Sequence, residues 1–130
     1  MPTKRKTTPV DGGINPEKLR WMYKTMWQIR AFEEKVAYLF SRGLVHGTTH
    51  LYIGEEATAV GVIGNLTEAD LIASTHRGHG HTIAKGIDLN RMAAELLGKA
   101  TGYCKGKGGS MHIADLSRGN LGANGIVGGG

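Results

Sequence analysis

Apolar residues recur at three- and four-residue spacing over residues 16–42, and this pattern predicts one long amphipathic helix. Asn15 stands where an N-cap belongs, Pro16 suits the first helical position, and Gly43 suits the position after the helix end. We expect the charged face of this helix to meet solvent and its broad apolar stripe to pack on something. The repeating positions are Leu19, Met22, Tyr23, Met26, Trp27, Phe32, Val36, Leu39 and Phe40.

Shorter patterns follow the long helix. A second helix is predicted from near Glu55 towards Leu66, a short buried strand over residues 70–74, and a further helix from an Asp88 cap through Leu97. A strand among helices indicates the α/β class. Acidic residues at the start of the second helix suit the helix dipole better than acid–base chemistry.

The last third of the chain is rich in glycine, with 11 glycines among the 33 residues 98–130. Such a segment cannot build a core by itself. It either is disordered or lets the backbone approach a bulky ligand closely. The spacings G-x-x-x-x-G-K-S/T and G-x-G-x-x-G are both absent, so the glycines form no P-loop and no dinucleotide fingerprint.

The net charge of +5 does not predict a nucleic-acid-binding protein, because three of its positive charges fall on Lys4, Arg5 and Lys6. Residues 11–130 hold 13 basic residues against 11 acidic ones, which is no electrostatic footprint. We expect residues 1–14 to be a flexible leader and see no secretory signal in them. The single cysteine excludes an intramolecular disulfide framework and suits a reducing, cytoplasmic location.

A histidine cluster follows the predicted strand, where α/β proteins place their ligand loops. His76, His79 and His81 form an H-x-x-H-x-H pattern that could hold zinc. Arg77 lies inside this pattern, and its fixed positive charge would repel a metal and attract phosphate. The residues alone leave open whether Arg77 binds phosphate or forms a structural ion pair.

Four segments together carry a resemblance to a known family. They are THLYIGEEA at 49–57, HRGHG at 76–80, GKGGSMH at 106–112 and GANGIVG at 122–128. In this order and at these separations they resemble the α subunits of thiamine-diphosphate-dependent pyruvate, branched-chain and acetoin dehydrogenases, and are most similar to bacterial pyruvate or acetoin enzymes. The resemblance implies that residues 15–130 are the leading part of a doubly wound, parallel-sheet, thiamine-diphosphate-binding domain.

The resemblance also implies roles for individual residues. Arg77 matches the arginine that holds the cofactor diphosphate, and His76 stands where many members carry a tyrosine facing the same group. His50 matches a histidine near the reacting carbon, where it donates a proton or stabilises developing charge. Gly125 and Val127 match backbone contacts to the aminopyrimidine ring. For Ser110 and His112 we expect only loop ordering, and for His46 a surface position.

The implied function is that of an E1 α subunit, with oxidative decarboxylation of a 2-oxo acid, pyruvate foremost, and acyl transfer to the lipoyl group of an E2 acyltransferase. A β subunit is the implied partner in a heterotetramer and supplies the glutamate that activates the cofactor. The Mg²⁺ ligands, a Gly-Asp-Gly motif and a later asparagine, are expected beyond residue 130. Alternatives are an acetoin dehydrogenase α subunit, a non-catalytic assembly protein that docks on a β subunit, and a zinc module. We expect residues 1–130 alone to be inactive and poorly folded.

Overall fold

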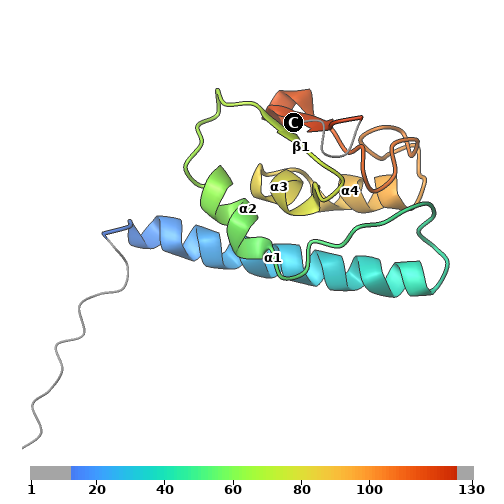
Figure 1. Cartoon of the computed structure of the whole chain (residues 1–130), viewed down its shortest axis with the longest axis horizontal. Coiled ribbons are helices and arrows are strands. Elements are labelled where there is room, and N and C mark those ends of the chain that lie inside the picture. The colour runs from blue at the N-terminus through green and yellow to red at the C-terminus, as the bar shows by residue number, and fades with distance from the viewer. Residues whose placement is uncertain (1–12, 126–130) are drawn as a thin grey trace, which may run out of the picture.

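The computed structural model describes residues 13–125. Its elements are α1 (Pro16–Ser41), α2 (Glu56–Ile63), β1 (Ile72–Ser74), α3 (His79–Ala84), α4 (Leu89–Leu96), the 3-10 helix η1 (Leu116–Arg118) and β2 (Asn120–Ala123). Helix α1 runs along one side, α2, α3 and α4 form the next layer, and the strands with η1 lie beyond them (Figure 1). Helices with a small parallel sheet place the described residues in the α/β class.

Helix α1 confirms the first prediction. The Asn15 side chain accepts a hydrogen bond from the Glu17 N–H at 2.7 Å, and Gly43 adopts a left-handed φ of +70° after the helix end. One charged residue lies outside the charged face, which the sequence pattern did not predict. Glu33 is fully buried, at 0% exposed, and stands between Ile29 and Val36 on the helix face that meets the core.

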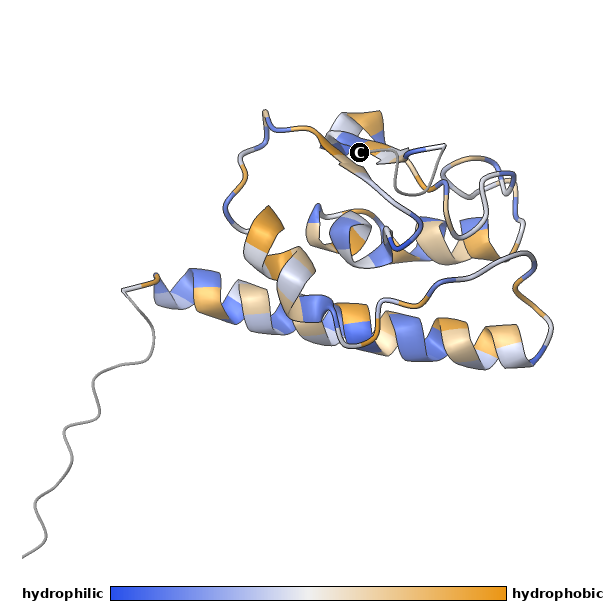
Figure 2. Cartoon of the chain, viewed as in Figure 1, coloured by the Kyte–Doolittle hydropathy of each residue, from blue (hydrophilic) through white to orange (hydrophobic). Residues whose placement is uncertain are grey.

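The main core lies between α1 and the second layer of helices. Helix α2 is mostly hydrophobic, whereas α1 alternates hydrophobic and hydrophilic positions along its length (Figure 2). A smaller cluster packs the end of α1 against α4 through Val36, Val45 and Leu96. The main cluster consists of Ile29, Tyr52, Ala59, Val60, Ile63, Ile83, Ala84, Ile87, Met92 and Ile113. Within residues 13–125, no helix is long and apolar enough to cross a lipid bilayer.

Two of the shorter elements agree with the sequence pattern. Helix α2 begins within one residue of its predicted start and ends three residues before Leu66. Helix α4 has the predicted cap, because Asp88 Oδ1 accepts the N–H groups of Asn90 at 2.8 Å and Arg91 at 3.0 Å. Gly98 follows α4 with φ +67°.

The strand was correctly predicted, but its full burial was not. β1 pairs in parallel with β2, with Ile72 opposite Asn120 and Ser74 opposite Ala123. Ile72 and Ser74 are half-buried and Ala73 is exposed. In the described part of the chain β1 has a single partner strand, so one of its edges is unpaired, and only the face that carries Ile72 packs against the core.

Helix α3 is the element that the sequence pattern missed. Residues 79–81, expected in a loop, form its first turn. Two glycines near its start lower the intrinsic helix propensity of this segment, so tertiary packing decides its conformation. Gly80 lies against the Tyr52 ring, where an added Cβ would come within 2.4 Å of ring carbons. A glycine is therefore what allows α3 to approach the 50–52 segment.

Candidate functional site

The ends of the two parallel strands bring distant parts of the chain to one edge. Residues 75–77 follow β1 and residues 124–125 follow β2. The Asn124 N–H donates to the Ser74 carbonyl at 2.9 Å, which extends the pairing one residue past the strands. The carboxyl edge of parallel strands is where α/β proteins bind ligands. His76, Arg77 and Gly125 therefore share the edge at which a ligand is expected.

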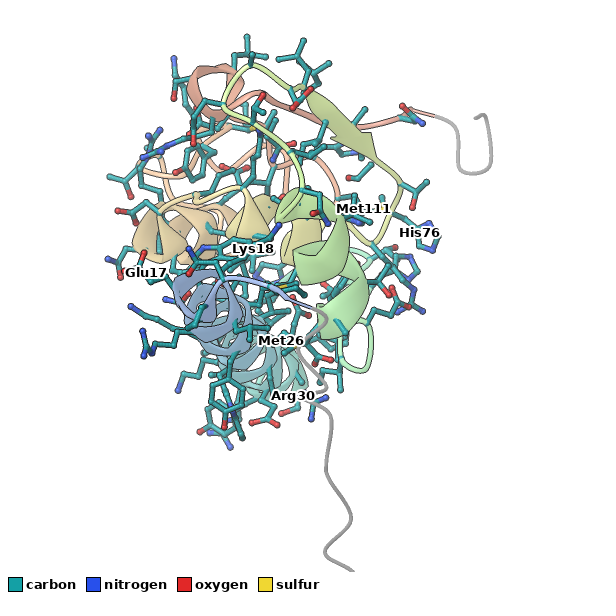
Figure 3. All side chains as sticks on the ribbon, turned by 90° about the vertical axis from the view of Figure 1, so that its left-hand side faces the viewer. Glu17, Lys18, Met26, Arg30, His76 and Met111 are labelled. Atoms are coloured by element: carbon teal, nitrogen blue, oxygen red, sulfur yellow. The ribbon has the colours of Figure 1, made fainter. Side chains whose placement is uncertain are left out.

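His50 reaches the same edge from the loop that precedes α2. Its ring stands nearly perpendicular to that of His76, with centroids 4.7 Å apart and an interplanar angle of 81°. Both histidines are half-buried, and His76 points outward at the surface of the molecule (Figure 3). The structure thus brings together three of the sequence-predicted site residues, His50, His76 and Arg77.

Arg77 links the strand edge to the 50–55 segment. Its Nη1 donates to the Leu51 carbonyl, and its Nε lies 3.9 Å from Glu55 Oε1. The ion pair is long, and its two side chains are 42% and 46% exposed. A pair of this kind contributes at most about 1 kcal/mol. A structural ion pair alone therefore explains little of why an arginine stands at position 77, and this geometry favours the phosphate-binding alternative.

Polar atoms without partners mark the surroundings of this edge. Within residues 13–125, Thr49 Oγ1, His76 Nδ1 and His81 Nδ1 are shielded from solvent and make no hydrogen bond. Buried polar atoms are almost always paired in native proteins. The unpaired Thr49 Oγ1 and His76 Nδ1 therefore leave hydrogen-bonding capacity on both segments beside the strand edge, residues 49–52 and 76–81.

Tyr52 and His81 form the inner wall beside these atoms, with Tyr52 Oη 3.4 Å from His81 Nε2. Burial, with smaller contributions from Glu55 and Glu56, raises the pKa of Tyr52 to about 12. Burial also lowers the pKa of His81, which the Arg77 carbonyl and Glu55 partly oppose. Tyr52 is therefore a neutral phenol at pH 7 and His81 a neutral imidazole, so both act as hydrogen-bonding groups rather than charges.

The three histidines of the H-x-x-H-x-H pattern do not converge. His79 is 1% exposed and points to the interior, where its Nδ1 lies 2.6 Å from Glu33 Oε1. Over residues 13–125, no three His, Cys, Asp or Glu side chains are arranged to hold a metal ion. The zinc alternative therefore loses its ligand set, because the helical turn of α3 directs His79 away from His76.

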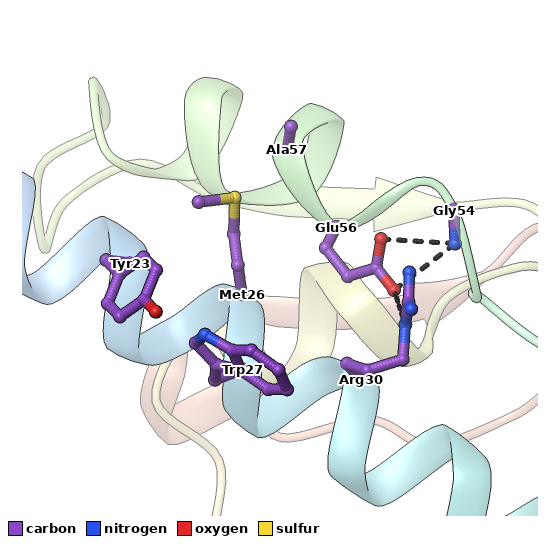
Figure 4. A pocket seen from close by; sticks show the side chains of 7 residues that line it. All are labelled: Tyr23, Met26, Trp27, Arg30, Gly54, Glu56 and Ala57. Carbon is purple, nitrogen blue, oxygen red and sulfur yellow. Dashed lines mark hydrogen bonds and ion pairs between the residues drawn. The ribbon is translucent and has the colours of Figure 1, made fainter.

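Glu56 has a structural task at the start of α2. Its Oε1 accepts from Arg30 Nε at 2.6 Å, and its carboxylate accepts the Gly54 N–H at 3.1 Å (Figure 4). The hydrogen bond from Arg30 lowers the pKa of Glu56, against the opposing effect of burial. The pair borders a pocket of about 250 Å³ between α1 and α2, lined by Tyr23, Met26, Trp27, Arg30, Gly54, Glu56 and Ala57.

The remaining sequence-predicted residues have varied positions. Gly125 is exposed, with open space where a side chain would be, and Val127 lies outside the described residues. Ser110 is buried with its Oγ 3.0 Å from His79 Nε2. His112 is exposed, and its carbonyl accepts the Cys104 thiol at 3.0 Å. His46 is exposed, as expected.

Sequence reasoning missed Glu33 and His79 as a pair. The available signal was the helical spacing of Glu33, four residues after Ile29 and three before Val36, which places a carboxylate on an apolar face. A buried carboxylate needs a partner. The partner is 46 residues away, and the sequence gives no indication of which residue it is.

Comparison with known proteins identifies the family. The model of the dehydrogenase E1 component family matches residues 24–130. The α subunit of acetoin:2,6-dichlorophenolindophenol oxidoreductase from Bacillus subtilis is 65% identical over 117 residues, 90% of this chain and 35% of that protein. Its counterpart from Cupriavidus necator is 56% identical over the same shares. The pyruvate dehydrogenase E1 component subunit alpha of Zymomonas mobilis is 46% identical over 86% of this chain and 32% of that protein. The chain spans about a third of the length of these relatives, and it belongs to the dehydrogenase E1 component family.

Proposed function

We propose that this chain is the leading part of an E1 α subunit that, with a β subunit, cleaves the carbon–carbon bond next to the carbonyl of a 2-oxo acid or of acetoin. The observation that carries the proposal is the shared strand edge, which gathers Arg77, His76 and Gly125 beside His50. Around this edge the unpaired Thr49 Oγ1 and His76 Nδ1 offer polar contacts to a ligand.

The residues present fit thiamine diphosphate. Arg77 offers a half-exposed guanidinium to diphosphate oxygens, and the unpaired His76 Nδ1 can add a hydrogen bond. Gly125 has no side chain to obstruct a ring that approaches its backbone. When bound, the cofactor supplies the electron sink for carbon–carbon cleavage. His50 is placed to donate a proton or hydrogen bond to the charge that develops beside it.

The wider assembly follows from the same proposal. The β1–β2 pair is the start of a doubly wound parallel sheet, and the Mg²⁺ ligands follow residue 130. The β subunit completes the site and an E2 acyltransferase accepts the acyl fragment on its lipoyl group. We infer a cytoplasmic location, because the single, free Cys104 suits a reducing compartment.

Acetoin is the second candidate substrate, favoured by a specific observation. The two acetoin-oxidoreductase relatives are 65% and 56% identical to this chain, whereas the bacterial pyruvate dehydrogenase relative is 46% identical. The test is to prepare the full-length α subunit with its β subunit and measure turnover of pyruvate, acetoin and branched-chain 2-oxo acids with an artificial electron acceptor. Turnover that requires thiamine diphosphate and Mg²⁺ supports the proposal. Tight α–β association without turnover of any of them would favour the assembly-protein alternative.

Arg77→Ala in the αβ enzyme is expected to weaken cofactor binding roughly tenfold to more than a hundredfold, because a charge-assisted contact contributes about 1.5–3 kcal/mol. Titrating thiamine diphosphate into both proteins and following intrinsic fluorescence measures the effect. Glu55→Gln is the matched control, since it removes the 3.9 Å ion pair and leaves the guanidinium in place. Equal dissociation constants for wild type and Arg77→Ala would remove Arg77 from the cofactor site.

Residues 1–130 expressed alone are expected to show no cooperative unfolding transition and no turnover. The reason is the outer face of α1, where Tyr23, Trp27 and Tyr38 are 63%, 59% and 55% exposed. Several large aromatic side chains exposed on one helix face promote association between molecules. Differential scanning calorimetry of the isolated chain, beside the same chain mixed with β subunit, checks the prediction. A sharp transition of the isolated chain would show that its own core is sufficient.

A further inference from the structure

A buried polar network lies directly beneath the candidate site. Glu33, His79 and Ser110 are 0%, 1% and 5% exposed and come from α1, α3 and the glycine-rich loop. Glu33 Oε1 lies 2.6 Å from His79 Nδ1, and His79 Nε2 lies 3.0 Å from both the Oγ and the carbonyl oxygen of Ser110. None of these three side chains is exposed enough to meet a substrate, so the network needs another purpose.

Both ring nitrogens of His79 have polar partners. A hydrogen on Nε2 is donated to the Ser110 carbonyl, which can only accept. One proton between His79 Nδ1 and Glu33 Oε1 completes the 2.6 Å contact. With both hydrogens in place the pair has no net charge, which is the form that a dry interior tolerates.

The second oxygen of Glu33 connects this network to the site. Glu33 Oε2 accepts the Tyr52 N–H at 3.0 Å. The Leu51 carbonyl, which belongs to the same peptide group as the Tyr52 N–H, accepts a hydrogen bond from Arg77. The 51–52 backbone is thus held from the interior by Glu33 and from the strand edge by Arg77. His50 directly precedes Leu51 in the chain, so both attachments act on the peptide group next to the residue whose ring contacts His76.

We propose that Glu33 and His79 are positioning residues. They hold the 50–52 segment so that His50 and Arg77 are correctly placed to contact the substrate and the cofactor. They act through the Tyr52 N–H and touch no reacting atom. The proposal rests on the proposed function for its kinetic consequence, but its structural consequence can be measured without turnover. Catalysis is sensitive to such positioning, since a displacement of about 1 Å can cost roughly a hundredfold in rate.

The test uses three variants of the full-length α subunit paired with its β subunit. Glu33→Leu removes both carboxylate contacts at similar volume. Glu33→Gln can keep them, because its oxygen accepts the Tyr52 N–H and its NH₂ donates to His79 Nδ1, while His79 Nε2 stays protonated.

Thr82→Val is the matched control, since it removes a buried 3.1 Å hydrogen bond from Asn120 to α3 and leaves the 50–52 segment untouched. Two readouts are kcat at saturating cofactor and substrate, and hydrogen exchange of the Tyr52 amide.

We expect Glu33→Leu to lower kcat about tenfold to a hundredfold and to speed exchange at Tyr52. Glu33→Gln should retain kcat and protection, and Thr82→Val should lower thermal stability without lowering kcat. Equal kcat losses in Glu33→Leu and Thr82→Val, or unchanged Tyr52 exchange in Glu33→Leu, would overturn the proposal. If the leucine variant does not fold, Glu33→Asp draws the carboxylate back by one methylene and must show the same two changes. A wild-type enzyme without turnover would reject the proposed function instead, while the exchange readout would still decide the positioning role.

Discussion

Glu95→Leu is expected to lower the free energy of unfolding of the full-length subunit by roughly 3 kcal/mol or more, because a charged acceptor of several hydrogen bonds is lost from the interior. Glu95 lies in α4 and is 1% exposed. Its carboxylate accepts four backbone N–H groups of the glycine-rich loop, those of Cys104, Gly106, Gly108 and Gly109, at 2.7, 2.9, 2.7 and 3.2 Å. Leucine fills the space and leaves all four donors without this partner.

The same contacts make this contribution depend on pH. Burial raises the pKa of Glu95, but the four N–H groups together outweigh it, so the pKa in the folded protein lies below the ordinary value of 4.5. A depressed folded pKa means that the stabilisation is fully present above pH 4.5. It is lost as pH falls from 4.5 through the lower folded pKa. The leucine variant should lack this part of the acid sensitivity.

Urea unfolding at pH 7 and at several acidic values, with hydrogen exchange of residues 98–112, measures both effects. Glu34→Gln is the matched control, because Glu34 is an exposed carboxylate on α1 whose removal should change stability by less than about 0.5 kcal/mol. Unchanged exchange in the loop of the Glu95 variant would mean that the glycine-rich loop holds its shape by other contacts.

Glu95 also explains part of the glycine density, which sequence reasoning attributed to disorder or to a ligand. A Cβ at Gly102 would lie 2.4 Å from Glu95 Oε2, and a Cβ at Gly106, where φ is +74°, would lie 2.4 Å from Gly98 backbone. The backbone of this loop wraps closely around a carboxylate of its own chain. The sequence alone could not predict this, because a glutamate inside a helix pattern resembles any solvent-facing one.

The helices that sequence reasoning predicted well are those whose signals are local. Helices α1 and α4 have capping side chains within three residues of their starts, and α1 has a long periodic apolar face. Helix α3 and β2 have no such signal, since one contains a glycine and the other is the sequence NLGA. Their conformations are decided by packing on Tyr52 and by pairing with β1.

The residues of the site also fall into two groups, those predicted from the sequence and those that depend on tertiary packing. That Arg77 and His76 stand after a strand was readable from the strand pattern, and their roles came from the resemblance to the family. The perpendicular contact of His50 with His76 joins residues 26 apart, and no spacing rule predicts it. The buried supports of the site, Glu33 and His79, were missed because they become a pair only when α1 and α3 pack together.

His50→Ala in the αβ enzyme is expected to lower kcat about a hundredfold, the usual contribution of a positioned acid–base group. The expected change in cofactor affinity is much smaller, because Arg77 stays bonded to the Leu51 carbonyl and keeps its place at the strand edge. Loss of the ring also removes the 4.7 Å contact with His76, which remains fixed by its position after β1.

The measurement separates binding from chemistry. Thiamine diphosphate is titrated into wild type and variant, and kcat is then determined at saturating cofactor for the preferred substrate. His46→Ala is the matched control, because it removes an exposed histidine from the same loop four residues earlier and should leave kcat at the wild-type level. A large loss of cofactor affinity with kcat restored at saturation would make His50 a binding residue. Normal turnover and affinity together would make it a loop residue with no part in the reaction.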